Sequence, residues 1–207
     1  VETTHWVKRG FWEVAFHPNH WLGIEMTGST LGIVGFGAIG KEVANRALGF
    51  DMNVISFSRT LHPAKQTPDI SNVDFNTLLS TSDFITLHVP YTPDTHHMIS
   101  YDQLKMMKPT SVLINTSRGP VVDTDALHWA LKNGVIRGAG LDVIDPEPIP
   151  SGHPILEMDN LLLTPHIGSA TVTTRRKMGL LAVQNVMAGL KGTILPSCAN
   201  PEVYKIR

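Results

Sequence analysis

Short apolar runs rich in β-branched residues recur along the chain from residue 31 onward. They are nearly continuous in apolar character rather than alternating, which is typical of parallel strands covered by helices on both faces of a sheet. The runs predict strands at 31–35, 53–57, 84–88, 111–115, 138–143 and 161–164.

Segments with helical periodicity lie between the predicted strands, near 38–50, 74–80, 100–107 and 123–133. Asp123 is placed to cap the last of these helices, and Gly134 is placed to stop it. Alternation of strands and helices indicates βαβ units. The predicted fold class is therefore α/β, a doubly wound parallel sheet with flanking helices.

The two ends of the chain differ from this middle part. Residues 1–23 hold three of the four tryptophans, and aromatic side chains at this density are usually buried. Met178–Leu190 is apolar on nearly every side, so a helix there must be covered on nearly every side. We expect an aromatic arm or dimer segment at 1–23, a nucleotide-binding domain at 24–170, and a C-terminal helix and tail at 171–207, all within a larger protein or assembly.

Composition narrows the classes of function. The formal net charge is −1 and no long basic run is present, which argues against nucleic-acid binding and a polybasic membrane patch. Cys198 is the single cysteine, so no disulfide can form within the chain, as expected in the reducing cytoplasm. No apolar stretch has the length of a membrane span. The start at Val1 shows no signal-peptide pattern and is typical of a chain entered in its middle.

A glycine-rich turn follows the first predicted strand, with the spacing G-x-G-x-x-G from Gly35 to Gly40. Gly35 permits a tight turn, Gly37 lets a pyrophosphate approach the backbone, and Gly40 lets the helix pack closely on the strand. The helix N-terminus then faces the phosphates. Inside repeated βαβ units, this pattern predicts a Rossmann NAD(P)-binding domain.

The end of the second strand bears on the choice of cofactor. An NAD site normally places Asp or Glu there to bind the ribose 2′-hydroxyl. Here Ser58, Arg59 and Thr60 stand at that position, and a guanidinium suits a phosphate. We expect NADP(H) as the preferred cofactor, with NAD(H) possible if Arg59 is a solvated loop cation.

Three further segments each follow a predicted strand. In an open α/β sheet, ligands bind at the carboxyl ends of the strands, so these segments should border one crevice. They are Asn115-Thr116-Ser117-Arg118-Gly119-Pro120, then Gly140-Leu141-Asp142-Val143 followed by Asp145-Pro146-Glu147-Pro148, and then Thr164-Pro165-His166-Ile167-Gly168-Ser169-Ala170.

Together with GFGAIG at 35–40, the segments NTSRGP, GLDVIDPEP and PHIGSAT resemble the signatures of the D-isomer-specific 2-hydroxyacid dehydrogenases. The resemblance extends from about Trp12 to Leu195. Within that family, the Ser-Arg-Thr strand end and the Thr-Arg pair after PHIGSAT look most like the glyoxylate/hydroxypyruvate and 2-ketogluconate reductases.

The resemblance implies a role for each residue of the constellation. Arg118 would hold the carboxylate of a 2-oxoacid and polarise its ketone, and His166 would protonate the developing alkoxide. Glu147 would orient the imidazole ring, and Asp142 would meet the nicotinamide carboxamide. Further cofactor contacts implied are Ala38, Ile39, Val89, Thr116, Ser117, Arg118, His166 and Gly168, with Ser169 and Arg175 on the substrate side.

The implied activity is NADPH-dependent reduction of a small 2-oxoacid of the glyoxylate/hydroxypyruvate type to the D-2-hydroxyacid, by a homodimer. No segment matches the family's N-terminal substrate domain, so we expect the isolated chain to bind NADPH but to turn over poorly. Two alternatives stay open, a nucleotide-sensing transcriptional corepressor of the same fold and a non-catalytic truncated isoform. The pair His96-His97 lacks further ligands at metal spacing, so no metal is expected.

Overall fold

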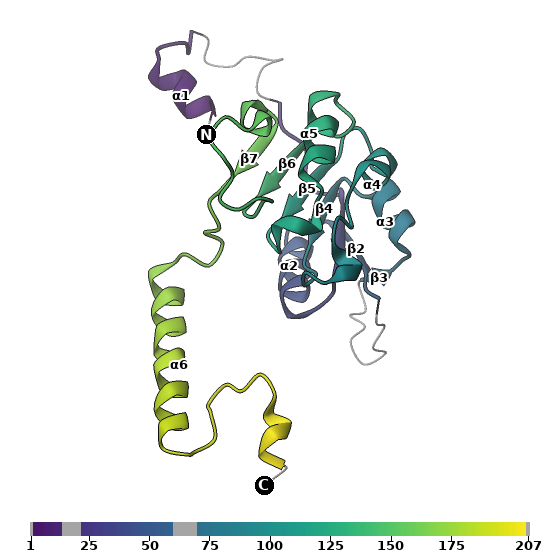
Figure 1. Ribbon diagram of the computed structural model, residues 1–207. Coiled ribbons are helices and arrows are strands. Elements are labelled where there is room, and N and C mark those ends of the chain that lie inside the picture. Colours follow the sequence, from purple (N-terminus) through teal and green to yellow (C-terminus); the bar gives the residue numbers. More distant parts are fainter. Residues whose placement is uncertain (1, 14–21, 60–69, 206–207) are drawn as a thin grey trace.

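Parallel strands form the frame of the molecule (Figure 1). The computed structural model describes residues 2–13, 22–59 and 70–205, and within these residues it has a seven-stranded parallel sheet of order β3-β2-β1-β4-β5-β6-β7. The strands are β1 (Thr30–Val34), β2 (Asn53–Phe57), β3 (Ser71–Asn72), β4 (Phe84–Leu87), β5 (Val112–Asn115), β6 (Gly138–Leu141) and β7 (Leu161–Leu163). The doubly wound α/β fold predicted from the apolar runs is confirmed.

Helices connect the strands and flank the sheet. The α-helices that connect the strands begin and end within two residues of their predicted bounds. Asp123 caps the helix Thr124–Lys132 by accepting a hydrogen bond from the Ala126 amide. The helices are α1 (Glu2–Lys8), α2 (Ala38–Leu48), α3 (Phe75–Thr81), α4 (Tyr101–Met106), α5 (Thr124–Lys132) and α6 (Val172–Leu190), with short 3-10 helices at Pro93–Thr95 (η2), Gly119–Val121 (η3), Pro154–Glu157 (η4) and Pro201–Lys205 (η5).

Two apolar clusters hold the helices against the sheet. Ile33 of β1 packs with Ala44 and Ala47 of α2 in one cluster. Val34, its neighbour in sequence, packs with side chains of α3, α4 and α5 in the other cluster. Successive strand residues point to opposite faces, so this division places α2 opposite the three other helices.

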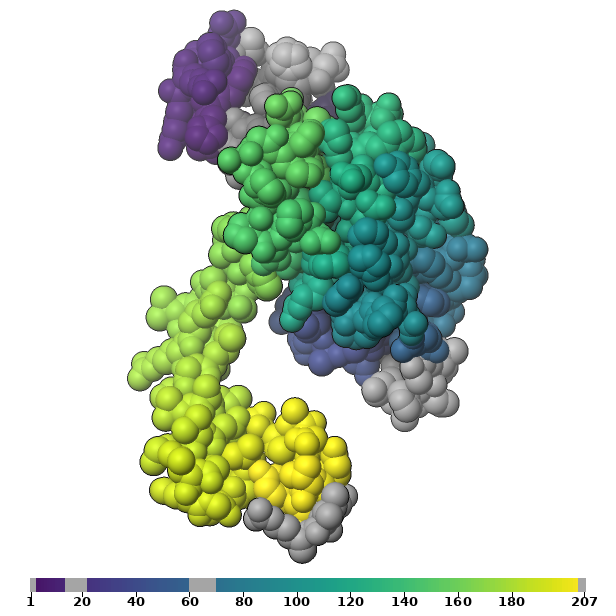
Figure 2. All heavy atoms as spheres, in the orientation of Figure 1, coloured from purple at the N-terminus to yellow at the C-terminus, as the bar shows by residue number. Residues whose placement is uncertain are grey.

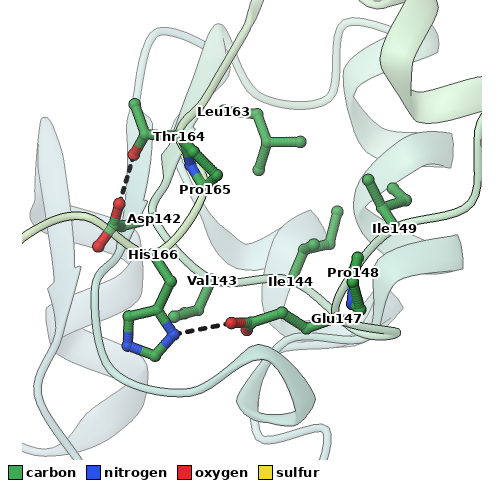
Figure 3. A pocket seen from close by; sticks show the side chains of 10 residues that line it. All are labelled: Asp142, Val143, Ile144, Glu147, Pro148, Ile149, Leu163, Thr164, Pro165 and His166. Atoms are coloured by element: carbon green, nitrogen blue, oxygen red, sulfur yellow. Dashed lines mark hydrogen bonds and ion pairs between the residues drawn. The ribbon is translucent and has the colours of Figure 1, made fainter.

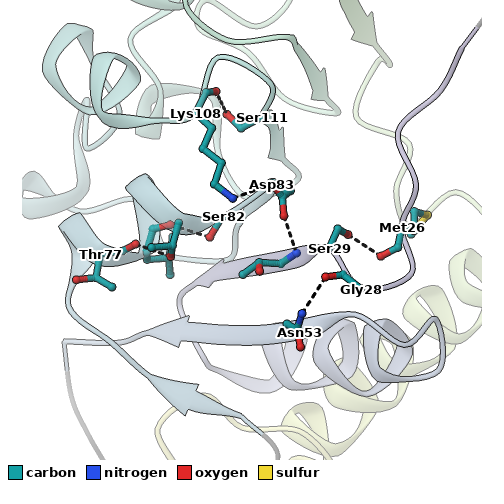
Figure 4. Close-up of polar contacts among 12 residues, drawn as sticks. Met26, Gly28, Ser29, Asn53, Thr77, Ser82, Asp83, Lys108 and Ser111 are labelled. Carbon is teal, nitrogen blue, oxygen red and sulfur yellow. Dashed lines mark hydrogen bonds and ion pairs between the residues drawn. The ribbon is translucent and has the colours of Figure 1, made fainter.

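A polar network links the N-terminal ends of neighbouring strands (Figure 4). It lies on the side of the sheet opposite the carboxyl ends of the strands. Asp83 accepts a 2.8 Å hydrogen bond from the Thr30 amide of β1 and another of 2.8 Å from Lys108 Nζ. The Lys108 ammonium and the Thr30 amide outweigh burial and hold the pKa of Asp83 below its ordinary value. Ionised Asp83 therefore links β1, β4 and the turn that leads into β5.

The C-terminal helix α6 extends away from the rest of the molecule (Figures 1 and 2). None of its residues is buried. The tail folds back on it, because Asn185 and the Ser197 backbone exchange two hydrogen bonds of 3.0 Å. In the part of the chain that the structure describes, no helix combines the length and apolar character needed to cross a membrane.

Candidate active site

The glycine loop between β1 and α2 is shaped by close backbone approaches. Gly35 has φ +95°, and a Cβ there would lie 2.6 Å from the His88 carbonyl oxygen. A Cβ on Gly40 would lie 2.3 Å from the Gly35 carbonyl oxygen. A Cβ on Gly37 would meet nothing within 4 Å. The loop is therefore packed tightly at its two ends and open at its middle, where the N-terminus of α2 begins without an acidic residue in its first turn.

A cavity of about 530 Å³ lies at the carboxyl ends of the strands. Strand order reverses between β1 and β4, and a doubly wound sheet binds ligands at such a switch point. The cavity brings together five residues that the sequence predicted as cofactor contacts, whereas Pro90 and Tyr91 in its lining were not predicted. The predicted residues in its lining are Ile39, Val89, Thr116, Ser117 and Arg118.

The predicted 2′-phosphate site follows β2. Ser58 and Arg59 lie directly after the strand, and Thr60 lies outside the described residues. Arg59 forms an ion pair with Asp94 of η2, between two largely exposed side chains. Arg59 is thus paired within the chain rather than simply solvated. Ala38 is exposed in the first turn of α2.

Arg118 is held by a buried amide at the end of β5. Asn115 Oδ1 accepts hydrogen bonds from the Ser117 amide (3.0 Å) and hydroxyl (2.8 Å), while Nδ2 donates to the Arg118 carbonyl (2.9 Å). These bonds fix the turn and leave the Arg118 side chain exposed. Asn115 was not predicted as a site residue, although a polar side chain ending an apolar strand was visible in the sequence.

The next residue brings two segments of the site together. A Cβ on Gly119 would lie 2.1 Å from the Ile144 carbonyl oxygen, so this contact is possible only for glycine. The turn that carries Arg118 therefore lies directly against the backbone that leads to Glu147.

His166 and Glu147 form the central polar pair of the site (Figure 3). His166 Nδ1 and Glu147 Oε1 are 2.7 Å apart, and both side chains are about half exposed. His166 has φ +52°, an uncommon conformation for a residue other than glycine. Such backbone strain persists where the surrounding structure enforces it, often at functional sites.

Asp142 supplies that enforcement. Its buried carboxylate accepts hydrogen bonds from the Thr164 hydroxyl (2.5 Å), the Ile167 amide (2.8 Å) and the Gly168 amide (2.7 Å). Burial alone would raise the pKa of Asp142. These hydrogen bonds and the nearby His166 together have the larger effect, so the pKa of Asp142 lies below its ordinary value. An ionised Asp142 thus anchors the segment that carries His166.

A second cavity, of about 500 Å³, lies beside His166 and Glu147 and is lined mostly by apolar side chains such as Ile144 and Leu163 (Figure 3). Arg118 does not line it, so Arg118 and His166 border different cavities of this chain. Ser169 and Arg175 are exposed and line neither cavity.

Across the described ranges, no group of three or more His, Cys, Asp or Glu residues is arranged to hold a metal ion. His96 and His97 stack with their ring centroids 3.9 Å apart, and His97 Nδ1 lies 3.9 Å from an oxygen of Asp123.

Sheet order, glycine loop and the crevice at the switch point define a dinucleotide-binding domain of the Rossmann class. The chain belongs to the D-isomer specific 2-hydroxyacid dehydrogenase family, whose NAD binding domain matches residues 1–168. The family resemblance seen in the sequence is therefore confirmed.

Several relatives are similar over nearly the whole chain. The glyoxylate reductase of Thermococcus litoralis is 50% identical over 98% of this chain and 62% of its own length. The TT0316 protein of Thermus thermophilus superposes with a TM-score of 0.89 at 45% identity, over 95% of this chain and 61% of that one. An acyclic imino acid reductase, Bsp5, solved with NADPH and D-Arg, has a TM-score of 0.82 at 32% identity, over 93% and 60%. The chain thus spans less than two thirds of the length of these relatives.

Proposed function

We propose that this chain forms the nucleotide-binding part of an NADPH-dependent reductase that converts a small 2-oxoacid of the glyoxylate/hydroxypyruvate type to the D-2-hydroxyacid. The observation that carries the proposal is the 2.7 Å pair of His166 and Glu147 at the strand ends of a dinucleotide-binding fold. The glyoxylate reductase of T. litoralis, half identical to this chain, supports the substrate class.

The glycine loop fits a dinucleotide. Gly37 leaves open space beside the N-terminus of α2, where backbone N–H groups and the helix dipole favour phosphates. Ser58, Arg59 and Thr60 would hold a 2′-phosphate, and none of these three residues is the Asp or Glu that binds a 2′-hydroxyl in an NAD site. The matched family domain is described as NAD binding and Bsp5 was solved with NADPH, so domains of this fold accept either nucleotide. The preference for NADP(H) rests on the Ser-Arg-Thr segment.

The cofactor, when bound, supplies the hydride to the carbonyl carbon of the substrate. The proton comes from His166. Because Nδ1 donates to Glu147, Nε2 is the ring nitrogen left to give its proton to the carbonyl oxygen. Glu147 keeps the ring oriented and stabilises it while it is charged. Arg118 binds the substrate carboxylate through charge-assisted hydrogen bonds.

We further propose that the chain works as a homodimer and is organised as an arm at 1–23, a nucleotide-binding domain at 24–170 and a C-terminal helix and tail at 171–207. Phe11 and Trp12 are 52% and 58% exposed, which is unusual for large aromatic side chains and suits a subunit interface. Phe16 and Trp21 of the same arm lie outside the described residues. Light scattering at micromolar concentration tests this, and a monomer would contradict it.

The decisive experiment follows NADPH oxidation by the full-length protein with a panel of 2-oxoacids. We expect turnover of glyoxylate or hydroxypyruvate, and a fall in kcat of about 10²- to 10⁴-fold in His166→Gln. Binding of NADPH to the same variant, measured directly, serves as the control for folding. If His166→Gln keeps most of the activity, the acid–base assignment is wrong.

A further inference from the structure

The ion pair of Arg59 and Asp94 joins two segments that flank the glycine loop. Arg59 follows β2, and Asp94 lies in η2, which follows β4. In the sheet, β2 and β4 lie on either side of β1, and the glycine loop begins where β1 ends. The pair therefore stands at the same end of the crevice as the loop that would receive the nucleotide.

Asp94 is carried by a braced turn. The Thr95 hydroxyl accepts a 2.8 Å hydrogen bond from the Thr92 amide and donates one of 2.7 Å to the Pro90 carbonyl. Pro90 and the adjacent Tyr91 line the 530 Å³ cavity. The turn that carries Asp94 is thus fixed relative to the crevice, whereas Arg59 reaches Asp94 on a long side chain.

We propose that Asp94 is a specificity-determining residue that limits the preference of this site for a 2′-phosphorylated nucleotide. The inference rests on the proposed role of Arg59 toward NADP(H). Asp94 and a 2′-phosphate compete for the same guanidinium, because both are anionic acceptors of its hydrogen bonds, so the phosphate must displace Asp94 from Arg59 in order to bind it. A 2′-hydroxyl is neutral, so NADH binding responds much less to the same carboxylate. Asp94 therefore reduces the difference in binding affinity between NADPH and NADH.

The test compares the dissociation constants of NADPH and NADH by isothermal titration calorimetry, for the 207-residue chain and its variants. Asp94→Asn keeps the size of the side chain and removes its charge. Asp102→Asn is the matched control, because Asp102 is an exposed carboxylate on α4 that pairs with Lys105. We expect the ratio Kd(NADH)/Kd(NADPH) to rise about threefold to tenfold in Asp94→Asn, as for charges separated by a few ångströms near a protein surface, and to stay constant in Asp102→Asn.

Two variants separate this proposal from the proposed cofactor preference. Arg59→Gln should lower the ratio, and in the Arg59→Gln background Asp94→Asn should have little further effect, because the two residues act as a pair. An unchanged ratio in Arg59→Gln overturns the role of Arg59 in NADP(H) binding and the role of Asp94 with it. A ratio that falls in Arg59→Gln but does not rise in Asp94→Asn overturns the role of Asp94 alone. An equal rise in both backgrounds shows general repulsion and also overturns it.

Discussion

The body of the molecule and the helix α6 are both rich in apolar residues, yet they differ in what they bury. Leu78 of α3 is fully buried against the sheet, whereas Leu190 of α6 is 80% exposed. Apolar content alone does not make a core. The body has strands and helices whose apolar faces meet, whereas no residue of α6 is buried and none belongs to the two core clusters.

The boundary between these two regions falls at the site. The Gly168 amide is bonded to the buried Asp142, and four residues later Val172 is 88% exposed. His166 therefore belongs to the packed region, and polar contacts of Asp142 fix it rather than the packing of the helix that follows. The helix α6 begins at Val172, six residues after His166, so it follows the site directly in sequence without forming its frame.

The largest expected effect is on stability. Leu78→Ala should lower the free energy of unfolding by about 2–5 kcal/mol, because it leaves a cavity in the core. Leu181→Ala on α6 removes the same atoms from an already exposed position and should change it by less than about 0.5 kcal/mol. Urea denaturation of the 207-residue chain measures both. A large loss in Leu181→Ala would mean that α6 packs on the body in solution.

Two glycines on helices sharpen the comparison. Gly40→Ala on α2 places a Cβ against the Gly35 carbonyl and should lower the free energy of unfolding by about 1–3 kcal/mol. Gly179→Ala on α6 meets no neighbouring atom, so it should leave the global unfolding midpoint unchanged and slightly increase helix content. Denaturation followed by circular dichroism reports both quantities. Equal destabilisation by the two substitutions would contradict the difference in packing.

Much of the body was predictable because local pattern and tertiary structure agree there. Continuous apolar runs predicted the strands from β1 onward, and the spacing of Gly35, Gly37 and Gly40 predicted the loop geometry. The two-residue strand β3 is too short to leave a pattern. The helix α1 lies in a segment interpreted only as aromatic.

The missing parts of the site depend on contacts between distant residues. Asp94 meets Arg59 across 35 positions of sequence, and no local pattern pairs them. The left-handed backbone of His166 follows from the anchoring of its segment to Asp142 and is equally invisible in sequence. Asn115 stood in a predicted segment, but its clamp on Arg118 required the folded turn. The sequence therefore pointed to the five residues that line the nucleotide cavity together, but not to the separation of Arg118 and His166 into different cavities, nor to the contacts that hold them.

The anchoring of the His166 segment accounts for a smaller, pH-dependent effect. Asp142→Asn leaves one acceptor oxygen where the carboxylate has two. This substitution should lower the free energy of unfolding by about 1–2 kcal/mol at neutral pH. Because the pKa of Asp142 is lowered in the folded state, its stabilising effect is present above about pH 4 and is lost as pH falls through that lowered value. Unfolding free energies of the two proteins should therefore converge in acid. A constant difference down to about pH 2 would contradict this account.

The smallest effect concerns His88, which lines the nucleotide crevice. Burial lowers the pKa of His88, so the unfolded chain takes up a proton at a higher pH than the folded chain does. Neutral His88 contributes its full share to the free energy of unfolding above about pH 6.5, the ordinary pKa of histidine. That share is lost as pH falls toward the lowered pKa of His88 in the folded state. The free energy of unfolding of the body should therefore begin to fall below about pH 6.5, well before the carboxylates are protonated, and His88→Asn should flatten that part of the profile. A fragment covering 171–205 lacks His88, so the helix signal of α6 in that fragment should show no step below about pH 6.5. If the free energy of unfolding of His88→Asn falls with pH as steeply as that of the unchanged chain, another group causes the effect.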